Sequence, residues 1–205
     1  MERSRPQVLT RGSLAGLIFT VALTGVVLQY QVTAALPDLQ PVMGVAWRLA
    51  GYFTILTNLG VACLMLSEFG GRQLSPRTAG GMMLSIAVVG ILYHLILARL
   101  WSPTGLAWWA DQTLHTVVPI LSALWWYGFA GKAVSLRDLP SWLVWPLAYA
   151  CYALIRGQAT GFWPYPFLDA DTLGWSAVAW NVGFLVVTFL GLGVATVVLA
   201  RRLIR

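Results

Sequence analysis

The sequence predicts an all-α protein: a single integral membrane domain of six transmembrane helices, with both termini in the cytoplasm. Of its 205 residues, 59% are hydrophobic and 10% are charged, whereas about 25% of residues are charged in an average soluble domain. The mean hydropathy is +0.74. So few charges could not cover the surface of a soluble domain, and an intrinsically disordered chain would need low hydrophobicity and high charge.

Each span is predicted from an apolar run, because about 20 such residues cross the hydrocarbon core as a helix. The six runs cover residues 14–36, 46–67, 79–101, 109–130, 142–155 and 173–200. The first is too long for a cleaved signal peptide, and five more follow it. The fifth contains Pro146, which is tolerated where neighbouring groups satisfy the backbone atoms that it frees. Cys63 and Cys151 lie within apolar runs and are expected to pack between helices.

The basic residues predict the orientation, because positively charged loops stay in the cytoplasm. Only Arg48, Arg99 and Arg156 fall on the outer side. The predicted cytoplasmic residues are Arg3, Arg5, Arg11, Arg72, Arg77, Lys132, Arg137, Arg201, Arg202 and Arg205. The outer acids are Asp38, Asp111, Asp169 and Asp171. Because the basic residues stand singly or in pairs between apolar runs, the net charge of +6 indicates no nucleic-acid partner. The expected location is the plasma membrane if the organism is bacterial.

Polar side chains from four predicted spans share the outer third of the membrane. At about 1.5 Å per residue, Thr54 and His94 lie roughly 10 Å below the outer surface. His115 lies roughly 9 Å and Asn181 roughly 12 Å below it. Polar groups are costly in a membrane, so this convergence at one depth indicates a functional site.

Helical spacing groups some of these side chains. Thr54, Thr57 and Asn58 share one face of the second span. Asp111 precedes His115 by one turn, so its carboxylate could hold one ring nitrogen and leave the other free. Structural roles are the alternative: threonine can bond the carbonyl four residues earlier, and asparagine can join helices.

Three motifs, in this order along the chain, resemble those of a known family. They are FTILTNL at 53–59, LHTVVP at 114–119 and GFWPYPFLD at 161–169. They are similar to motifs of the Pr6Pr-type six-span membrane proteins, which are related to the FAR-17a/AIG1-like family of androgen-induced gene 1 and androgen-dependent TFPI-regulating proteins. The six-span layout agrees with this resemblance over nearly the whole chain.

The resemblance implies an intramembrane hydrolase of fatty acid esters of hydroxy fatty acids, with a threonine nucleophile and a histidine. His115 matches the family's histidine. Aligning the asparagine that follows the first motif places Ile55 opposite the nucleophile, and a shift of one residue places Thr54 there. Thr57 is the other candidate. Depth favours Thr54, which is level with His115, because Thr57 lies about one turn deeper.

The chemistry expected of this pair is acyl transfer to Thr54, with His115 as general base and Asp111 orienting the imidazole. An oxyanion would need hydrogen-bond donors. The candidates at the same level are Asn58, Asn181, His94 and Tyr93. Arg156 and Arg99 would bind a substrate carboxylate, or else extend to lipid head groups. Residues 163–167 would form a rigid lid over the site, or else an ordinary interfacial loop.

Other function classes stay open from the sequence. His94 and His115 at matched depth would suit bis-histidine haem ligation in a redox protein. A transporter would need broken helices with charges near the midplane, and a non-catalytic lipid-binding protein would need only a pocket. No metal or other cofactor is expected, because no ligand cluster has the required spacing. The expected partners are membrane lipids and a lipid ester substrate; the sequence leaves the oligomeric state open.

Overall fold

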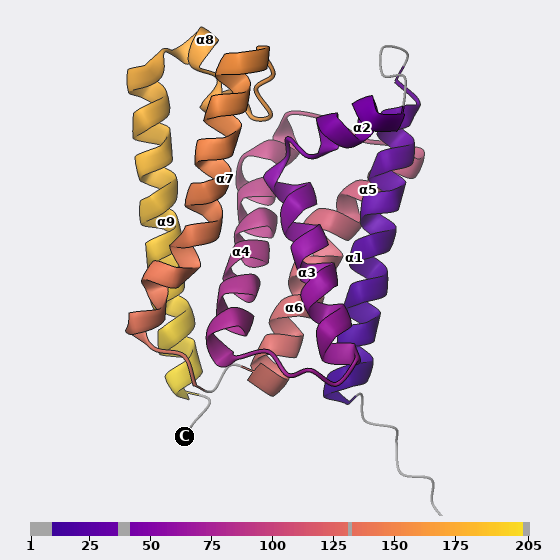
Figure 1. Cartoon of the computed structure of the whole chain (residues 1–205), viewed down its shortest axis with the longest axis vertical. Coiled ribbons are helices and arrows are strands. Elements are labelled where there is room, and N and C mark those ends of the chain that lie inside the picture. The colour runs from indigo at the N-terminus through magenta and orange to yellow at the C-terminus, as the bar shows by residue number, and fades with distance from the viewer. Residues whose placement is uncertain (1–9, 37–41, 131–132, 203–205) are drawn as a thin grey trace, which may run out of the picture.

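A computed structural model describes residues 10–36, 42–130 and 133–202, and the regular structure of these residues is helical. Figure 1 shows the long helices standing side by side as a bundle. The longer helices are α1 (Arg11–Ala34), α3 (Phe53–Phe69), α4 (Pro76–Leu95), α7 (Leu139–Thr160) and α9 (Trp175–Arg202). Shorter ones are α2 (Val42–Leu49), α5 (Gly105–Gln112), α6 (Val118–Trp125) and α8 (Ala170–Leu173). Five charged residues used in the orientation argument lie outside the described residues: Arg3, Arg5, Asp38, Lys132 and Arg205.

Three of the described helices are long and apolar enough to cross a membrane. They are α1, the stretch Pro76–Arg99 that joins α4 to a short 3₁₀ turn, and α9. The pair α2 and α3 would add a fourth if it counts as one broken span. Helix α1 begins and α9 ends at the same end of the bundle, the lower end in Figure 1. The structure therefore supports a helical membrane protein.

The second apolar run is broken, so the predicted continuous helix over 46–67 was wrong. Helices α2 and α3 are bent by 93° relative to each other, and α2 lies across the upper end of the bundle (Figure 1). Side chains from α7 and the loop after it crowd the break: a Cβ on Gly51 would lie 2.6 Å from the Phe162 ring and 2.9 Å from the Arg156 guanidinium. The freed Gly51 carbonyl accepts a hydrogen bond from Tyr149 (2.8 Å), as a backbone group in a membrane requires.

The fourth apolar run forms a continuous helical segment with two wider π-helical turns. The turn η2 (Thr113–Val117) separates α5 from α6, and η3 (Trp126–Ala130) follows α6. Pro119 explains the first, because a proline ring clashes with the carbonyl four residues earlier, here that of His115. The fifth helix, α7, is longer than the predicted 142–155, contains Pro146 and ends at Gly161 in the left-handed region (φ +67°). Glycine adopts that conformation without a steric penalty.

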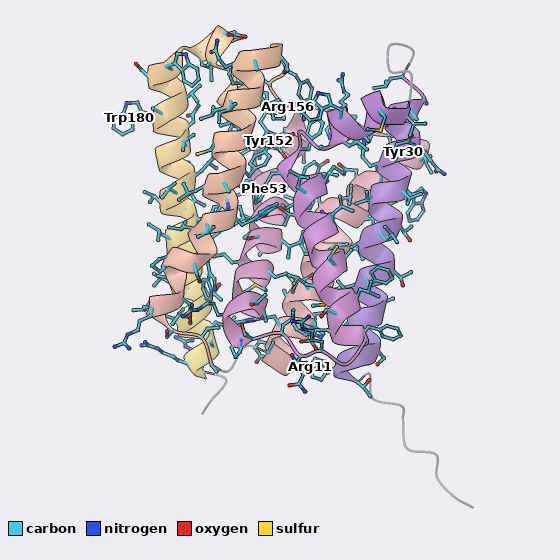
Figure 2. The ribbon with its side chains drawn as sticks, viewed as in Figure 1. Arg11, Tyr30, Phe53, Tyr152, Arg156 and Trp180 are labelled. Atoms are coloured by element: carbon cyan, nitrogen blue, oxygen red, sulfur yellow. The ribbon has the colours of Figure 1, made fainter. Side chains whose placement is uncertain are left out.

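The helices pack around α4, which contacts α3, α6, α7 and α9. Helix α1 covers α3 and α5, while α7 and α9 form a pair at the other side (Figure 1). The core between α1, α3, α4 and α6 contains Ile18, Met65, Ile86 and Trp125, each less than 1% exposed. At the periphery Trp180 points away from the bundle (Figure 2) and is 81% exposed. Cys63 and Cys151 are free and exposed, so the expectation that they pack between helices was wrong.

One ion pair joins α1, α3 and the end of the fourth segment. The Arg11 guanidinium donates to both carboxylate oxygens of Glu68 and to the Phe129 carbonyl. It also lies 5.2 Å from the centre of the Trp125 ring, while the Trp125 indole N–H donates to the Arg11 carbonyl. The Glu68 side chain is only 1% exposed. A buried carboxylate must be paired, so this contact fixes the lower end of α1 (Figure 2).

We expect Glu68→Gln to destabilise the bundle by roughly 1–3 kcal/mol, because it weakens a charged hydrogen-bond network and leaves the Arg11 charge without its partner. The measurement is unfolding in detergent, followed by tryptophan fluorescence. Arg11→Gln and the double variant complete a thermodynamic cycle. Strictly additive losses would show that the two side chains are not coupled.

Candidate active site

Thr54 and His115 meet, although 61 residues separate them in the chain. Thr54 lies in the first turn of α3 and is 9% exposed. His115 lies in the π-helical turn η2. The distance from Thr54 Oγ1 to His115 Nε2 is 3.4 Å, at the long end of hydrogen-bond range, as is common for catalytic pairs without substrate. A π-helical turn often marks a functional position.

The other ring nitrogen of His115 fixes the tautomer of the imidazole. His115 Nδ1 lies 3.0 Å from the Asp111 backbone carbonyl oxygen and 3.3 Å from Asp111 Oδ1. A carbonyl oxygen only accepts hydrogen bonds, so in the neutral ring the proton is on Nδ1. The lone pair of Nε2 then faces the Thr54 hydroxyl. The Asp111 side chain is 1% exposed, which places a buried carboxylate beside the imidazole.

Tyr93 holds the imidazole plane in place. Its ring stacks on that of His115, with centroids 3.8 Å apart and an interplanar angle of 16°. The Trp101 indole N–H donates to the Tyr93 hydroxyl (3.2 Å). Gly90 allows α4 to approach this closely, because a Cβ there would lie 3.0 Å from the His115 carbonyl oxygen and 3.2 Å from Pro119 Cβ. Tyr93 therefore positions the His115 ring.

Three of the four proposed oxyanion donors, Asn58, Asn181 and His94, make hydrogen bonds to other groups, and of these Asn58 lies beside the Thr54–His115 pair. Asn58 is fully buried and donates to the Thr54 carbonyl (2.9 Å) and the Leu114 carbonyl (3.4 Å), so it ties α3 to the histidine segment. Asn181 donates to the Phe167 carbonyl (2.9 Å) and holds the loop before α8. His94 is exposed, and its Nε2 pairs with Thr116 (3.0 Å).

Thr57 points away from the imidazole. It is 4% exposed, and its hydroxyl accepts a hydrogen bond from the Trp145 indole (3.1 Å). It borders a different hollow of the bundle from the one that His115 lines. Of the two candidate nucleophiles, only Thr54 has its hydroxyl within reach of His115.

Tyr165 is a site residue that sequence reasoning did not single out. The Thr54 amide N–H donates to the Tyr165 hydroxyl oxygen (3.4 Å), and the Tyr165 ring stacks on Phe167 with centroids 5.1 Å apart. Burial raises the pKa of the Tyr165 hydroxyl, so it remains protonated. The sequence signal was its place in the aromatic 161–169 motif, which the structure folds back onto the start of α3.

Two cavities meet at the pair. One, of about 440 Å³, is lined by His115, Tyr93 and Arg48, among others. The other is a small apolar cavity of about 90 Å³ between α3, α4, α7 and α9. Thr54, Tyr165 and Leu97 line both. The Thr54 hydroxyl therefore lies where the larger, more polar cavity joins the small apolar cavity.

The arginines of this end are arranged differently from the prediction. Arg156 is 6% exposed and enclosed by aromatic rings, with its guanidinium 4.1 Å from the Trp47 ring centre and 4.9 Å from that of Phe162 (Figure 2). Arg48, which was not singled out, lines the larger cavity and also faces Phe162 at 5.4 Å. Arg99 is exposed and lines neither cavity.

No group of three His, Cys, Asp or Glu side chains in the described ranges is placed to hold a metal ion. No family model matches the chain, and neither a curated protein nor a solved structure matches it significantly. The site is therefore interpreted from its own geometry.

We expect Gly90→Ala to destabilise the protein by about 1–3 kcal/mol, the usual cost of overpacking, because the backbone of the histidine segment cannot easily move away. Gly60→Ala is the matched control. Its Cβ would meet nothing within 4 Å, so the better helix propensity of alanine should leave stability unchanged or raise it by up to about 1 kcal/mol. Thermal unfolding in detergent measures both, and an equal response would refute the close approach at Gly90.

Proposed function

We propose that this protein is an intramembrane threonine hydrolase that cleaves lipid esters in the outer leaflet. The observation that carries the proposal is the Thr54–His115 pair, in which the tautomer leaves an accepting nitrogen facing a hydroxyl where two cavities meet. Acyl transfer would use Thr54 as nucleophile and His115 as base, with the Asp111 backbone carbonyl orienting the imidazole and the Asp111 carboxylate beside it.

In the first half of the reaction, the Thr54 hydroxyl attacks the ester carbonyl and its proton passes to His115 Nε2. The buried Asp111 carboxylate stabilises the imidazolium that forms. Collapse of the tetrahedral intermediate breaks the bond to the alcohol oxygen, which takes the proton back from Nε2. In the second half, His115 deprotonates a water that hydrolyses the acyl-threonine and restores the hydroxyl.

The oxyanion is stabilised by groups at the start of α3. Helix α3 has no side-chain cap at Tyr52, and its first intrahelical bond is from the Leu56 amide to the Tyr52 carbonyl. The amides of the first turn are therefore free of intrahelical partners, and the positive end of the helix lies at the site. Because Tyr165 accepts from the Thr54 amide, its own hydroxyl hydrogen is available to the oxyanion.

The cavities support a substrate with one apolar chain and one more polar portion. The small cavity would take part of an acyl chain beside residues such as Val89, Leu147 and Phe189. The larger cavity would take the alcohol portion, with Arg48 placed to pair with a substrate carboxylate. Arg156, enclosed by aromatic rings nearby, would add positive potential. Exposed Arg99 lines neither cavity, so the structure gives no support for its binding a substrate carboxylate. This substrate agrees with the fatty acid esters of hydroxy fatty acids that the family resemblance implies.

The proposal includes six spans with both termini in the cytoplasm. The broken α2–α3 pair, the segment from α5 to η3, and α7 would complete the set begun by α1, α4 and α9. Six crossings return the chain to its starting side, as the common end of α1 and α9 suggests (Figure 1). By the positive-inside rule, Arg11, Arg202 and that end face the cytoplasm, and the site faces the outer leaflet of the plasma membrane in a bacterium.

The haem and transport alternatives have less support. Haem ligation would need both imidazoles directed at one iron, whereas His115 faces Thr54 and exposed His94 pairs with Thr116. Transport would need a path across the bundle, but the cavity beside His115 and the hollow near Thr57 share no lining residue. A non-catalytic lipid-binding role is the outcome if no ester is cleaved.

We expect purified protein to hydrolyse long-chain lipid esters, and Thr54→Ala and His115→Ala to reduce kcat by at least about 10²-fold, the lower range for loss of general base catalysis. Thr57→Ala is the matched control on the same helix face and should retain activity. Mass spectrometry of a covalently labelled peptide locates the nucleophile. Wild-type activity in Thr54→Ala would contradict the proposal.

We expect Tyr165→Phe to lower kcat by about 10²–10³-fold, as loss of one oxyanion donor does, while KM changes little. Tyr127→Phe, at a side chain that is 53% exposed and lines neither cavity, should behave as wild type. If both variants keep full kcat, Tyr165 only closes the cavity.

A further inference from the structure

A third hollow lies in the half of the bundle away from the proposed site. It has a volume of about 520 Å³ and runs between α3, α4 and the start of α7. Its lining covers Thr57 to Leu64 on α3 and Arg77 to Ser85 on α4, a length of roughly 10–12 Å at the helical rise. The Thr57–Trp145 hydrogen bond lies at its upper end, and it shares no lining residue with either cavity at the site.

A missing side chain on α3 hollows out this groove, and a glycine on α4 lets a tryptophan ring form its wall. Gly60 on α3 faces open space, since a Cβ there would meet nothing within 4 Å. On α4, Gly81 brings the Trp142 ring against the helix, where a Cβ would lie 2.8 Å from it. Exposed Cys63 lines the same groove. A groove on the side of a membrane-embedded bundle must be filled by an apolar group, because a void forfeits packing contacts.

The charged lining residue of the groove, Arg77, lies at its lower mouth with two hydroxyl side chains. Arg77, Thr78 and Ser141 lie there, at the start of α4 and of α7. Asp138 accepts a hydrogen bond from Arg77 Nε (2.8 Å), yet the Arg77 side chain remains 62% exposed. Among the described residues of this end, the acids are Glu68 and Asp138, both already paired. The described arginines of this end are Arg11, Arg72, Arg77, Arg137, Arg201 and Arg202.

We propose that this groove is a binding site for an anionic glycerophospholipid of the cytoplasmic leaflet, with one acyl chain between α3, α4 and α7 and its phosphate at Arg77. The cationic end complements the negative head group, and the exposed Arg77 guanidinium, which bonds Asp138 through Nε, can donate to phosphate oxygens. The apolar groove, hollowed at Gly60, takes the chain. This site is separate from the proposed hydrolase and would hold a resident lipid that is not cleaved.

The test fills the groove without disturbing its walls. Gly60→Leu places a side chain into open space, and Gly191→Leu on α9 is the matched control, because a Cβ there also meets nothing within 4 Å and the position lines none of the three hollows. Each protein is reconstituted in equal parts phosphatidylcholine and phosphatidylglycerol and extracted in mild detergent. Native mass spectrometry then counts the retained lipids.

We expect wild type and Gly191→Leu to retain phosphatidylglycerol in preference to phosphatidylcholine, and Gly60→Leu to retain several-fold less. Arg77→Gln should lower the preference, whereas Arg201→Gln, at the same end but outside the groove, should not. If Gly60→Leu fails to fold, Cys63→Phe with Cys151→Phe as its control repeats the comparison at two exposed cysteines. Equal retention of both lipids by wild type, or undiminished retention when the groove is filled, overturns the proposal.

Discussion

The break between α2 and α3 is the constraint on which the site depends. In one continuous helix the Thr54 amide would bond the Ala50 carbonyl, and the first turn of α3 would lie inside the ladder. At the break, the amide instead donates to Tyr165, and the Gly51 carbonyl accepts from Tyr149. Two tyrosines from distant parts of the chain thus satisfy backbone atoms that the membrane cannot hydrate. These two hydrogen bonds offset the cost of the break, which leaves a helix N-terminus beside the Thr54 hydroxyl.

The π-helical turn around His115 is a second irregularity, on the segment that faces α3. Pro119 lacks an amide hydrogen and its ring crowds the His115 carbonyl. His115 lies in the wider turn, and Gly90 lets α4 pack closely behind it. In a regular helix, the direction of the His115 side chain would follow from its position in the helical repeat alone. Each irregularity lies beside one member of the reacting pair, so local departures from helix geometry and the proposed chemistry coincide.

The sequence was informative where physical rules act locally. Apolar runs located the long helices, and depth counted along them brought Thr54 level with His115 and separated it from Thr57. The sequence was not informative where side chains from distant parts of the chain determine the local geometry. A hydropathy window averages across the bend at Gly51, where Arg156 of α7 and Phe162, just after that helix, pack against the glycine. Likewise, an outer position in the sequence does not indicate which arginine lines a cavity, and in the structure Arg48 does.

The aromatic loop, residues 161–169, connects the helix break, Thr54 and the outer arginines. Asn181 holds its Phe167 carbonyl from α9, Tyr165 reaches the Thr54 amide, and Phe162 lies against both Arg48 and Arg156. One short segment thus contacts the helix break, Thr54 and the two arginines at once. An interfacial loop that only connected α7 to α9 would have no need to bury a tyrosine hydroxyl at the start of α3, because burial without a strong acceptor is costly. That cost is understandable if the hydroxyl is kept free to donate to an oxygen that becomes charged during the reaction.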